Sequence, residues 1–364
     1  MSGGPDPWAW MGLLKWSLSY SDGTSDASNV TPMSEEDKAF LEMVMKEGII
    51  NENDRMRTIL KQLTDCMDHY QRMATSQASS SKDDADGAAT SKEDGKADEP
   101  PVSDEELEGL LQELRDIVEQ IDYARAFMSM KGLPFLLGGI QEREAVPEAI
   151  RGMCLGLIST LCQNNPPVQK ELLELGALKS ITDMYFSEKS GHAMKAKYMQ
   201  AMSSIVRSHE LAENVMDGLD QTVALFVDGL NPTTSTDNLK RRTLFFLHAY
   251  VTSDTATAQR VKRLAGPVGI AADYFLEESP TNSPEIREMT LALLQQILEQ
   301  EKSVDSILQR KTGLVALGVQ RISALRKLTG DEKEYATAEL EGWESLIRLL
   351  SRATPDELLA DAAK

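Results

Sequence analysis

Four basic residues recur at nearly constant spacing, each near the start of a long segment with helical periodicity. They are Arg151, Lys197, Arg242 and Arg287, separated by 46, 45 and 45 residues. Guanidinium and ammonium groups bind carboxylates through charge-assisted hydrogen bonds. If equivalent helices stack, the four side chains form a row that suits a partner with an acidic surface. The alternative is that each one pairs with a neighbouring Glu or covers apolar core with its aliphatic stem.

Catalytic and metal-binding patterns are missing from the sequence. It contains neither the phosphate-binding pattern GxxxxGK[ST] nor the dinucleotide-binding pattern GxGxxG. His209 and Glu210 are followed by Glu213 rather than by a second histidine, so the zinc pattern HExxH does not form. His69, His192 and His248 lie in different helical segments, so no two of these histidines occur at metal-ligand spacing. We therefore expect a protein that is not an enzyme and needs no cofactor or metal.

The segments that carry the basic residues repeat with a period of 42 to 48 residues. An apolar helical pattern ends at a glycine and a new apolar segment follows, at Gly132, Gly176, Gly218, Gly266 and Gly313. A polar loop, a longer helix and a short final helix complete each unit. Armadillo and HEAT repeats have periods of roughly 40–47 residues. We expect an all-α armadillo/HEAT-like solenoid of about four repeats with helical caps, whose long helices line a concave groove.

Composition agrees with this fold and limits the partners. Leu, Met, Ala, Glu, Lys and Gln are frequent and aromatic residues make up only 5%, which favours helices over strands. The net charge of −20 argues against nucleic-acid binding. No segment approaches the roughly 18 consecutive apolar residues of a membrane helix. Cys66, Cys154 and Cys162 form no CxxC pair, so we expect buried, reduced thiols in a cytosolic protein.

The N-terminal third is expected to contain three parts. Residues 1–33 predict a flexible segment around one apolar island, which either caps the array or binds a partner. Residues 34–73 predict a helical hairpin that opens with a capping box at Ser34. Residues 74–104 predict a flexible acidic linker, because residues 74 to 106 hold ten acidic and three basic residues and almost no large apolar side chain.

The remaining two thirds are expected to form the repeat domain, residues 105–350, followed by a tail, 351–364. A single helix is predicted from Glu105 to the first repeat glycine, because apolar residues recur at helical spacing throughout LEGLLQELRDIVEQIDYARAFMSM.

Several motifs together resemble one family. They are LLKWS near the N-terminus, an acidic or Gly-rich spacer, EQIDYARAF before the first repeat, LCQNNPPVQ at the end of the first long helix and SSIVRSHE at the end of the second. This combination is similar to the armadillo-type nucleotide-exchange factors of the 70-kDa heat-shock chaperone, in their cytosolic branch. The similarity covers residues 105–255 well. Beyond residue 255 it rests mainly on the repeat period.

The resemblance implies a body that embraces one lobe of the chaperone's nucleotide-binding domain, so that ADP is released without a catalytic residue of the co-chaperone. The family's IDxA or LDNA signature corresponds to Asp122, Tyr123 and Ala124, which implies that a bulky residue at position 124 clashes with the chaperone. The family's LKxRA arginine corresponds to Arg242. Thr243 stands where Ala is usual, so Arg241 is the alternative.

The LLKWS patch, with Leu13, Leu14 and Trp16, resembles the family's release segment, which competes for the chaperone's peptide groove. A monomer in the cytosol, with access to the nucleus, is expected. The endoplasmic-reticulum branch would need a cleavable signal and often a retention tail, and neither is recognisable in the sequence.

The rival interpretation is an armadillo adaptor without exchange activity. Adaptors that grip extended peptides use Trp and Asn pairs on the long helices. Here Trp8, Trp10, Trp16 and Trp343 all lie outside the four main long helices, and the basic row has the wrong sign for a basic peptide. An adaptor for another acidic protein stays open as the alternative.

Overall fold

The computed structural model describes residues 35–36, 38–39, 51–80, 102–141, 145–187, 191–279, 282–300 and 305–351. The chain divides into two compact units, Met1–Ile59 and Leu60–Lys364, which we consider separately. The first unit is described only at a few helical residues near Glu35 and at the beginning of the helix α3. The predicted N-terminal segment, the capping box at Ser34 and most of the predicted linker lie outside the described residues.

All regular elements among the described residues are helices, apart from an isolated bridge between Ser279 and Asn282. The helices are α3 Glu52–Ser80, α4 Asp104–Val118, α5 Ile121–Ser129, α6 Gly132–Gln141, α7 Glu148–Leu161, α8 Pro166–Glu174, α9 Ala177–Ser187, α10 His192–Val206, α11 Glu210–Gly218, α12 Thr222–Gly229, α13 Asp237–Thr252, α14 Ala258–Arg263, α15 Ala265–Tyr274, α16 Pro284–Glu299, α17 Asp305–Leu308, α18 Lys311–Leu325, α19 Asp331–Tyr335 and α20 Thr337–Ser351. The predicted all-α class is confirmed.

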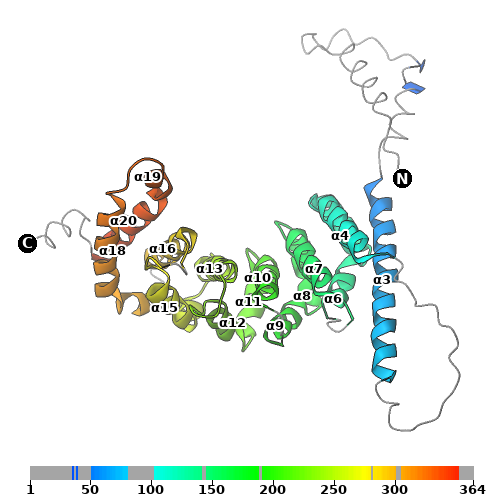
Figure 1. Cartoon of the computed structure of the whole chain (residues 1–364), viewed down its shortest axis with the longest axis horizontal. Helices are drawn as coiled ribbons and strands as arrows, with labels where there is room; N and C mark the ends of the chain where they lie inside the picture. Colours follow the sequence, from blue (N-terminus) through cyan, green and yellow to red (C-terminus); the bar gives the residue numbers. More distant parts are fainter. Residues whose placement is uncertain are drawn as a thin grey trace, which may run out of the picture. The chain divides into compact units, whose positions relative to one another are not determined.

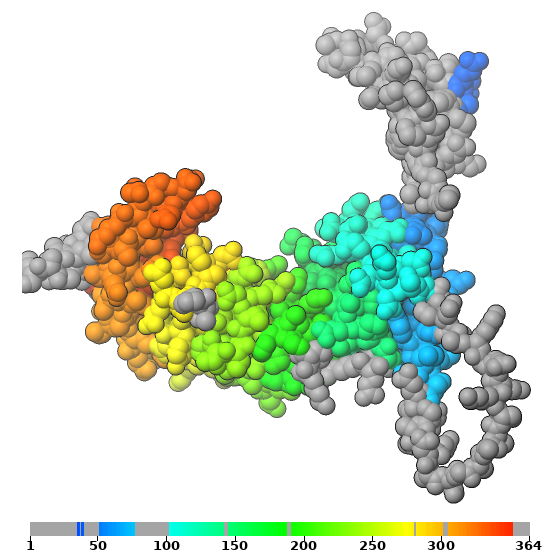
Figure 2. All heavy atoms as spheres, viewed as in Figure 1, coloured from blue at the N-terminus to red at the C-terminus, as the bar shows by residue number. Residues whose placement is uncertain are grey.

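Within Leu60–Lys364 the helices form repeating units of three. A helix of 8–11 residues (α6, α9, α12, α15) precedes a long helix (α7, α10, α13, α16), and a helix of 4–9 residues (α8, α11, α14, α17) follows it. The long helices pack on one another in chain order, from α4 through α7, α10, α13 and α16 to α20 (Figure 1). Figure 2 shows the surfaces of successive repeats in contact. Packing of each unit on its neighbours defines a solenoid, so the armadillo-like fold is confirmed.

The long helices are buried on most sides because each lies between two neighbours and rests on shorter helices. On α10, Ala196, Met199 and Met202 are completely buried. Small residues let neighbouring helices approach, and methionine fills irregular gaps. In the next repeat the rings of Phe226, Phe246 and Tyr250 pack together with centroids 5.1–6.1 Å apart. These ring contacts hold α12 against α13.

The repeat glycines have different roles. Among the five, only Gly176 adopts the left-handed backbone, with φ of 70° in the turn between α8 and α9. Gly132 is required for space, because a Cβ atom there would lie 2.2 Å from the ring of Phe127. The sequence period therefore marks where new helices begin rather than one shared backbone conformation.

The single helix predicted from Glu105 to the first glycine is wrong, because it is divided in two. Gln120 has an extended backbone, with φ of −84° and ψ of 127°, and separates α4 from α5. Ile121 continued the apolar pattern in the sequence but is 45% exposed, since the chain changes direction there. The start of α4 has a capping box that the sequence analysis missed, formed by Ser103 and Glu106.

The helix α3 ends at Ser80, whereas the sequence analysis placed the start of the linker at residue 74. Its Leu63 and Cys66 are buried. The Tyr70 hydroxyl donates a hydrogen bond to Asp104 Oδ1 at 2.5 Å, which links α3 to the first turn of α4. Burial together with this hydrogen bond raises the pKa of Tyr70.

The three cysteines are free and buried, as predicted. Burial raises the pKa of the Cys154 thiol to about 12, and it also raises the pKa values of Cys66 and Cys162. All three thiols are therefore protonated and unreactive at neutral pH. Among the described helices, none combines the length and the apolar character that a membrane crossing requires.

Candidate functional site

The predicted basic row lies on four consecutive long helices, but its two end members are buried. Arg151 is 5% exposed, and its Nη1 donates to the Tyr198 hydroxyl at 3.4 Å. Arg287 is 6% exposed and pairs with Glu339 of α20 at 2.9 Å. Arg287 thus follows the alternative considered from the sequence, in which the basic residue pairs with a neighbouring Glu instead of facing a partner. Both side chains connect adjacent long helices.

Lys197 is half-buried on α10 and lies across Gly152 of α7. A Cβ atom at Gly152 would be 2.2 Å from Lys197 Nζ. The missing side chain at Gly152 thus provides the space in which the lysine stem packs. Its ammonium group sits at the junction of the first two repeats.

Arg242 is a half-buried member of the basic row whose guanidinium group forms no ion pair among the described residues. Its Nε donates to Asn238 Oδ1 at 3.2 Å, one turn earlier on α13, and no other partner is present among the described residues. Partial burial, followed by the neighbouring positive charge of Arg241, lowers the pKa of Arg242. An anion at this place would favour the charged guanidinium and so act against both effects. Arg241, the alternative from the sequence, is engaged in an ion pair with Glu285 of α16.

Two further side chains complete the site, and the sequence analysis missed both. Phe245 follows Arg242 by one turn of α13 and is 45% exposed. The guanidinium carbon of Arg207, at the end of α10, lies 4.8 Å from the centre of the Phe245 ring, in a cation–π contact. The sequence signal was the spacing of Arg242 and Phe245 at i and i+3, which places the two side chains on one face of the helix.

These side chains surround a cleft of about 500 Å³. We call it the cationic-aromatic cleft and define it by Arg207, Arg241, Arg242 and Phe245. Its other lining residues are Gln163, Gln200, Ser203, Ser204, Asn238, Glu285 and Met289. Three guanidinium groups against one carboxylate make it a locally positive site in a chain of net charge −20. Charge-assisted hydrogen bonds beside an exposed aromatic ring suit an acidic protein surface.

The signature residues of α5 are placed differently from the cleft, and none of them lines it. Asp122 is exposed, Tyr123 is half-buried and Ala124 is only 2% exposed. The side chain of Ala124 is therefore part of this protein's own core. Enlarging it would disturb α5 before any partner is met.

The remaining predicted residues, Leu13, Leu14 and Trp16, lie outside the described residues. The part of the chain that the structure describes holds no group of three or more His, Cys, Asp or Glu residues arranged to bind a metal ion. His248 of α13 is bonded to Gln296 of α16, with 2.6 Å between Nε2 and Oε1. Burial lowers the pKa of His248, so this contact between long helices holds a neutral imidazole at neutral pH.

Comparison with solved structures finds designed armadillo repeat proteins. One matches 66% of this chain and 94% of its own length, with a TM-score of 0.47 and 15% sequence identity. Another, solved in complex with a (KR)4 peptide, matches 66% of this chain and 93% of its own, with a TM-score of 0.47 and 13% identity. No protein-family model matches the chain.

Comparison with curated sequences finds proteins that carry related names. Hsp70-binding protein 1 of Mus musculus is 27% identical over 205 residues, which is 55% of this chain and 49% of that protein. Hsp70-binding protein 1 of Homo sapiens is 30% identical over 112 residues, 31% of this chain and 30% of that protein. The Hsp70 nucleotide exchange factor fes1 of Schizosaccharomyces pombe is 25% identical over 168 residues, 46% of this chain and 56% of that protein.

The chain thus spans about half or less of the length of the first of these relatives. Their names agree with the resemblance read from the motifs of residues 105–255. That resemblance is confirmed: the chain is a homologue of proteins named Hsp70-binding protein 1 and Hsp70 nucleotide exchange factor Fes1.

Proposed function

We propose that this protein is a co-chaperone that binds the nucleotide-binding domain of a 70-kDa heat-shock chaperone and promotes release of ADP. The names of its relatives support the partner and the activity. At the level of residues, the proposal is carried by the cationic-aromatic cleft, where the guanidinium group of Arg242 forms no ion pair among the described residues. The cleft lies on the face of the array formed by the long helices α10, α13 and α16, which we call the long-helix face. In this proposal the protein has no catalytic residue and needs no cofactor.

The proposed mechanism is differential binding. A protein that binds the open conformation of the chaperone's nucleotide site more tightly than the ADP-closed one shifts the population toward the open form. The shift cannot exceed the difference between the two affinities. A rigid array suits this task because its contact residues are held by packing against neighbouring repeats. Arg242 and Arg207 would bind carboxylates of the chaperone, and Phe245 would provide the apolar anchor.

The other predicted residues take secondary roles in this proposal. Asp122 would contact the chaperone from the exposed surface of α5. Lys197 would extend the positive surface toward α7. Arg151 and Arg287 would act indirectly, by holding the long helices that present the cleft. The LLKWS segment would displace bound clients, and we place the protein in the cytosol as a monomer.

The test is stopped-flow release of a fluorescent ADP analogue from a cytosolic 70-kDa chaperone. The wild-type chain should accelerate release by orders of magnitude. Arg242→Ala should weaken chaperone binding by about 1–3 kcal/mol, because a charge-assisted contact is lost. The matched control is Lys262→Ala, an exposed cation on α14 that does not line the cationic-aromatic cleft.

Unchanged affinity in Arg242→Ala, with exchange retained, would contradict the role of the cleft. No acceleration by a folded, helical wild-type chain would contradict the exchange function itself. The chain would then be a helical-repeat adaptor for another acidic partner.

A further inference from the structure

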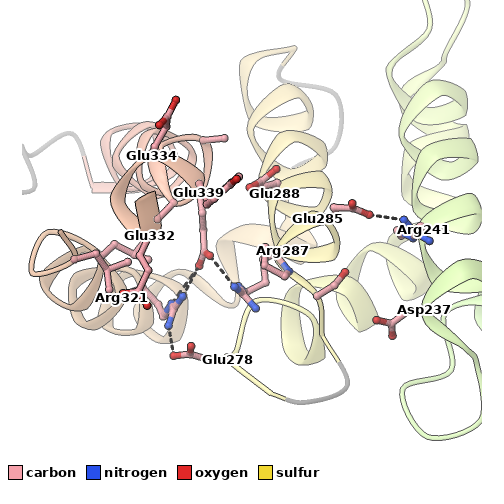
Figure 3. A pocket seen from close by; sticks show the side chains of 17 residues that line it. Asp237, Arg241, Glu278, Glu285, Arg287, Glu288, Arg321, Glu332, Glu334 and Glu339 are labelled. Atoms are coloured by element: carbon pink, nitrogen blue, oxygen red, sulfur yellow. Dashed lines mark hydrogen bonds and ion pairs between the residues drawn. The ribbon is translucent and has the colours of Figure 1, made fainter. Parts of the chain in front are cut away.

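A second cleft adjoins the first toward the C-terminal end of the array. It has a volume of about 1050 Å³ and is lined by residues of α13, α16, α18, α19 and α20. Arg241 and Glu285 line both clefts, so the two are continuous. Figure 3 shows Arg287 and Arg321 directed at Glu339, and Arg241 directed at Glu285.

The charge of this cleft is opposite to that of the first. Its carboxylates are Asp237, Glu278, Glu285, Glu288, Glu332, Glu334 and Glu339, and its guanidinium groups are those of Arg241, Arg287 and Arg321. We call it the acidic cleft and define it by these residues. All three arginines are already paired with carboxylates of the cleft. Asp237, Glu288, Glu332 and Glu334 have no ion pair within the described part of the chain, so negative charge remains uncompensated.

The excess of negative charge affects the carboxyl group of Glu288. Burial, and then the charges of Glu339 and Glu285, raise the pKa of its carboxyl group. A cationic group placed near Glu288 would offset the repulsion among these three carboxylates.

The cleft also has apolar and aromatic side chains that a protein segment could contact. Tyr335 at the end of α19 is 82% exposed, the most exposed large hydrophobic residue among those described. Leu325 and Leu328 form part of the wall. Arg287 is 6% exposed, and its Nε, like the hydroxyl of Ser283, is a buried donor without an acceptor among the described residues. Both donors are covered by surrounding atoms, so the accessible groups of the cleft are its carboxylates and the Tyr335 ring, and an exposed tyrosine fits a cationic side chain.

We propose that the acidic cleft binds a lysine- or arginine-bearing segment of the protein partner that occupies the long-helix face. Charge complementarity and continuity with the cationic-aromatic cleft support this occupant. The long-helix face then has a fixed polarity, positive between α10 and α13 and negative between α16 and α20. A partner could bind in only one direction, because the reverse orientation brings like charges together at both clefts.

The experiment measures fluorescence anisotropy of a labelled peptide of alternating Lys and Arg, about eight residues long, with the full-length chain. The variant is Glu332→Gln with Glu334→Gln, two exposed residues of α19 whose neutralisation leaves the core untouched. A second variant is Tyr335→Ala. The matched control is Glu210→Gln with Asp220→Asn, which removes two exposed acids remote in sequence and outside the cleft.

We expect the double α19 variant to bind the peptide about tenfold more weakly than the wild type and the control. The acidic linker attracts the peptide equally in all variants, so the difference between variants isolates the cleft. Equal binding by the α19 variant and the control, or no binding by the wild type, would overturn the proposal. This assay contains no chaperone. A negative result would therefore contradict the proposal for the acidic cleft and leave the proposed exchange function untested by it.

Discussion

The side chain of Ala124 is 2% exposed. Weaker chaperone binding by a variant with a bulky residue there would therefore not by itself demonstrate a clash with the chaperone. We predict that Ala124→Arg lowers the free energy of unfolding by about 1–3 kcal/mol or more, because it overpacks α5 and buries a charge. Urea unfolding followed by far-UV circular dichroism measures this loss. Asp122→Ala, at an exposed position two residues earlier, should change stability by less than about 0.5 kcal/mol. If Ala124→Arg is as stable as the wild type, a binding defect in that variant would instead be the clash itself.

At the scale of elements, the sequence predicted the order and period of the helices and the helices that carry the basic row. It did not predict which members of the row are accessible. Arg242 and Arg287 occupy similar places in successive long helices, yet only Arg287 faces a carboxylate of a later helix, Glu339. That difference depends on how each helix is rotated in its packing. Phe245 was missed for the same reason, since an apolar residue within an apolar helix is normally buried.

The helix α8 positions one wall of the cationic-aromatic cleft. The Gln169 side chain is 4% exposed, and its Nε2 donates to the backbone oxygens of Ser204, Ile205 and Arg207 at 3.0–3.1 Å. These carbonyls belong to the last turn of α10, just before Ser208 takes a φ of 59°. Helix carbonyls at a C-terminus need such donors because they have no partner within the helix.

We predict that Gln169→Leu destabilises the protein by about 1–3 kcal/mol, because buried carbonyls lose their donor. It should also weaken chaperone binding, although Gln169 itself does not line the cationic-aromatic cleft, because the end of α10 holds Arg207 against Phe245. Thermal unfolding and chaperone titration measure the two effects. The neighbouring Lys170→Ala, an exposed change on the same helix, is the control. Loss of stability with normal binding would show that Arg207 is held independently of α8.

At the scale of the whole molecule, the chain is strongly acidic while its proposed contact site is positive. Repulsion between this chain and an acidic partner acts over the Debye length, about 10 Å at 0.1 M salt. Attraction at the cationic-aromatic cleft acts at contact between half-buried groups, which salt screens less. Salt therefore affects the encounter of the two proteins and the stability of their complex differently. The association rate constant measures the first effect and the dissociation rate constant measures the second.

We predict that the association rate constant with an acidic chaperone stays level or rises between low and moderate salt, since screening removes the net repulsion of a chain with charge −20. The dissociation rate constant should increase only slightly, because Arg207 and Arg242 are partly withdrawn from solvent. Stopped-flow binding across a NaCl series measures both constants, with Arg242→Ala as the comparison. A steep fall in the association rate with salt would mean that the local field of the three arginines, rather than the net charge, guides the encounter.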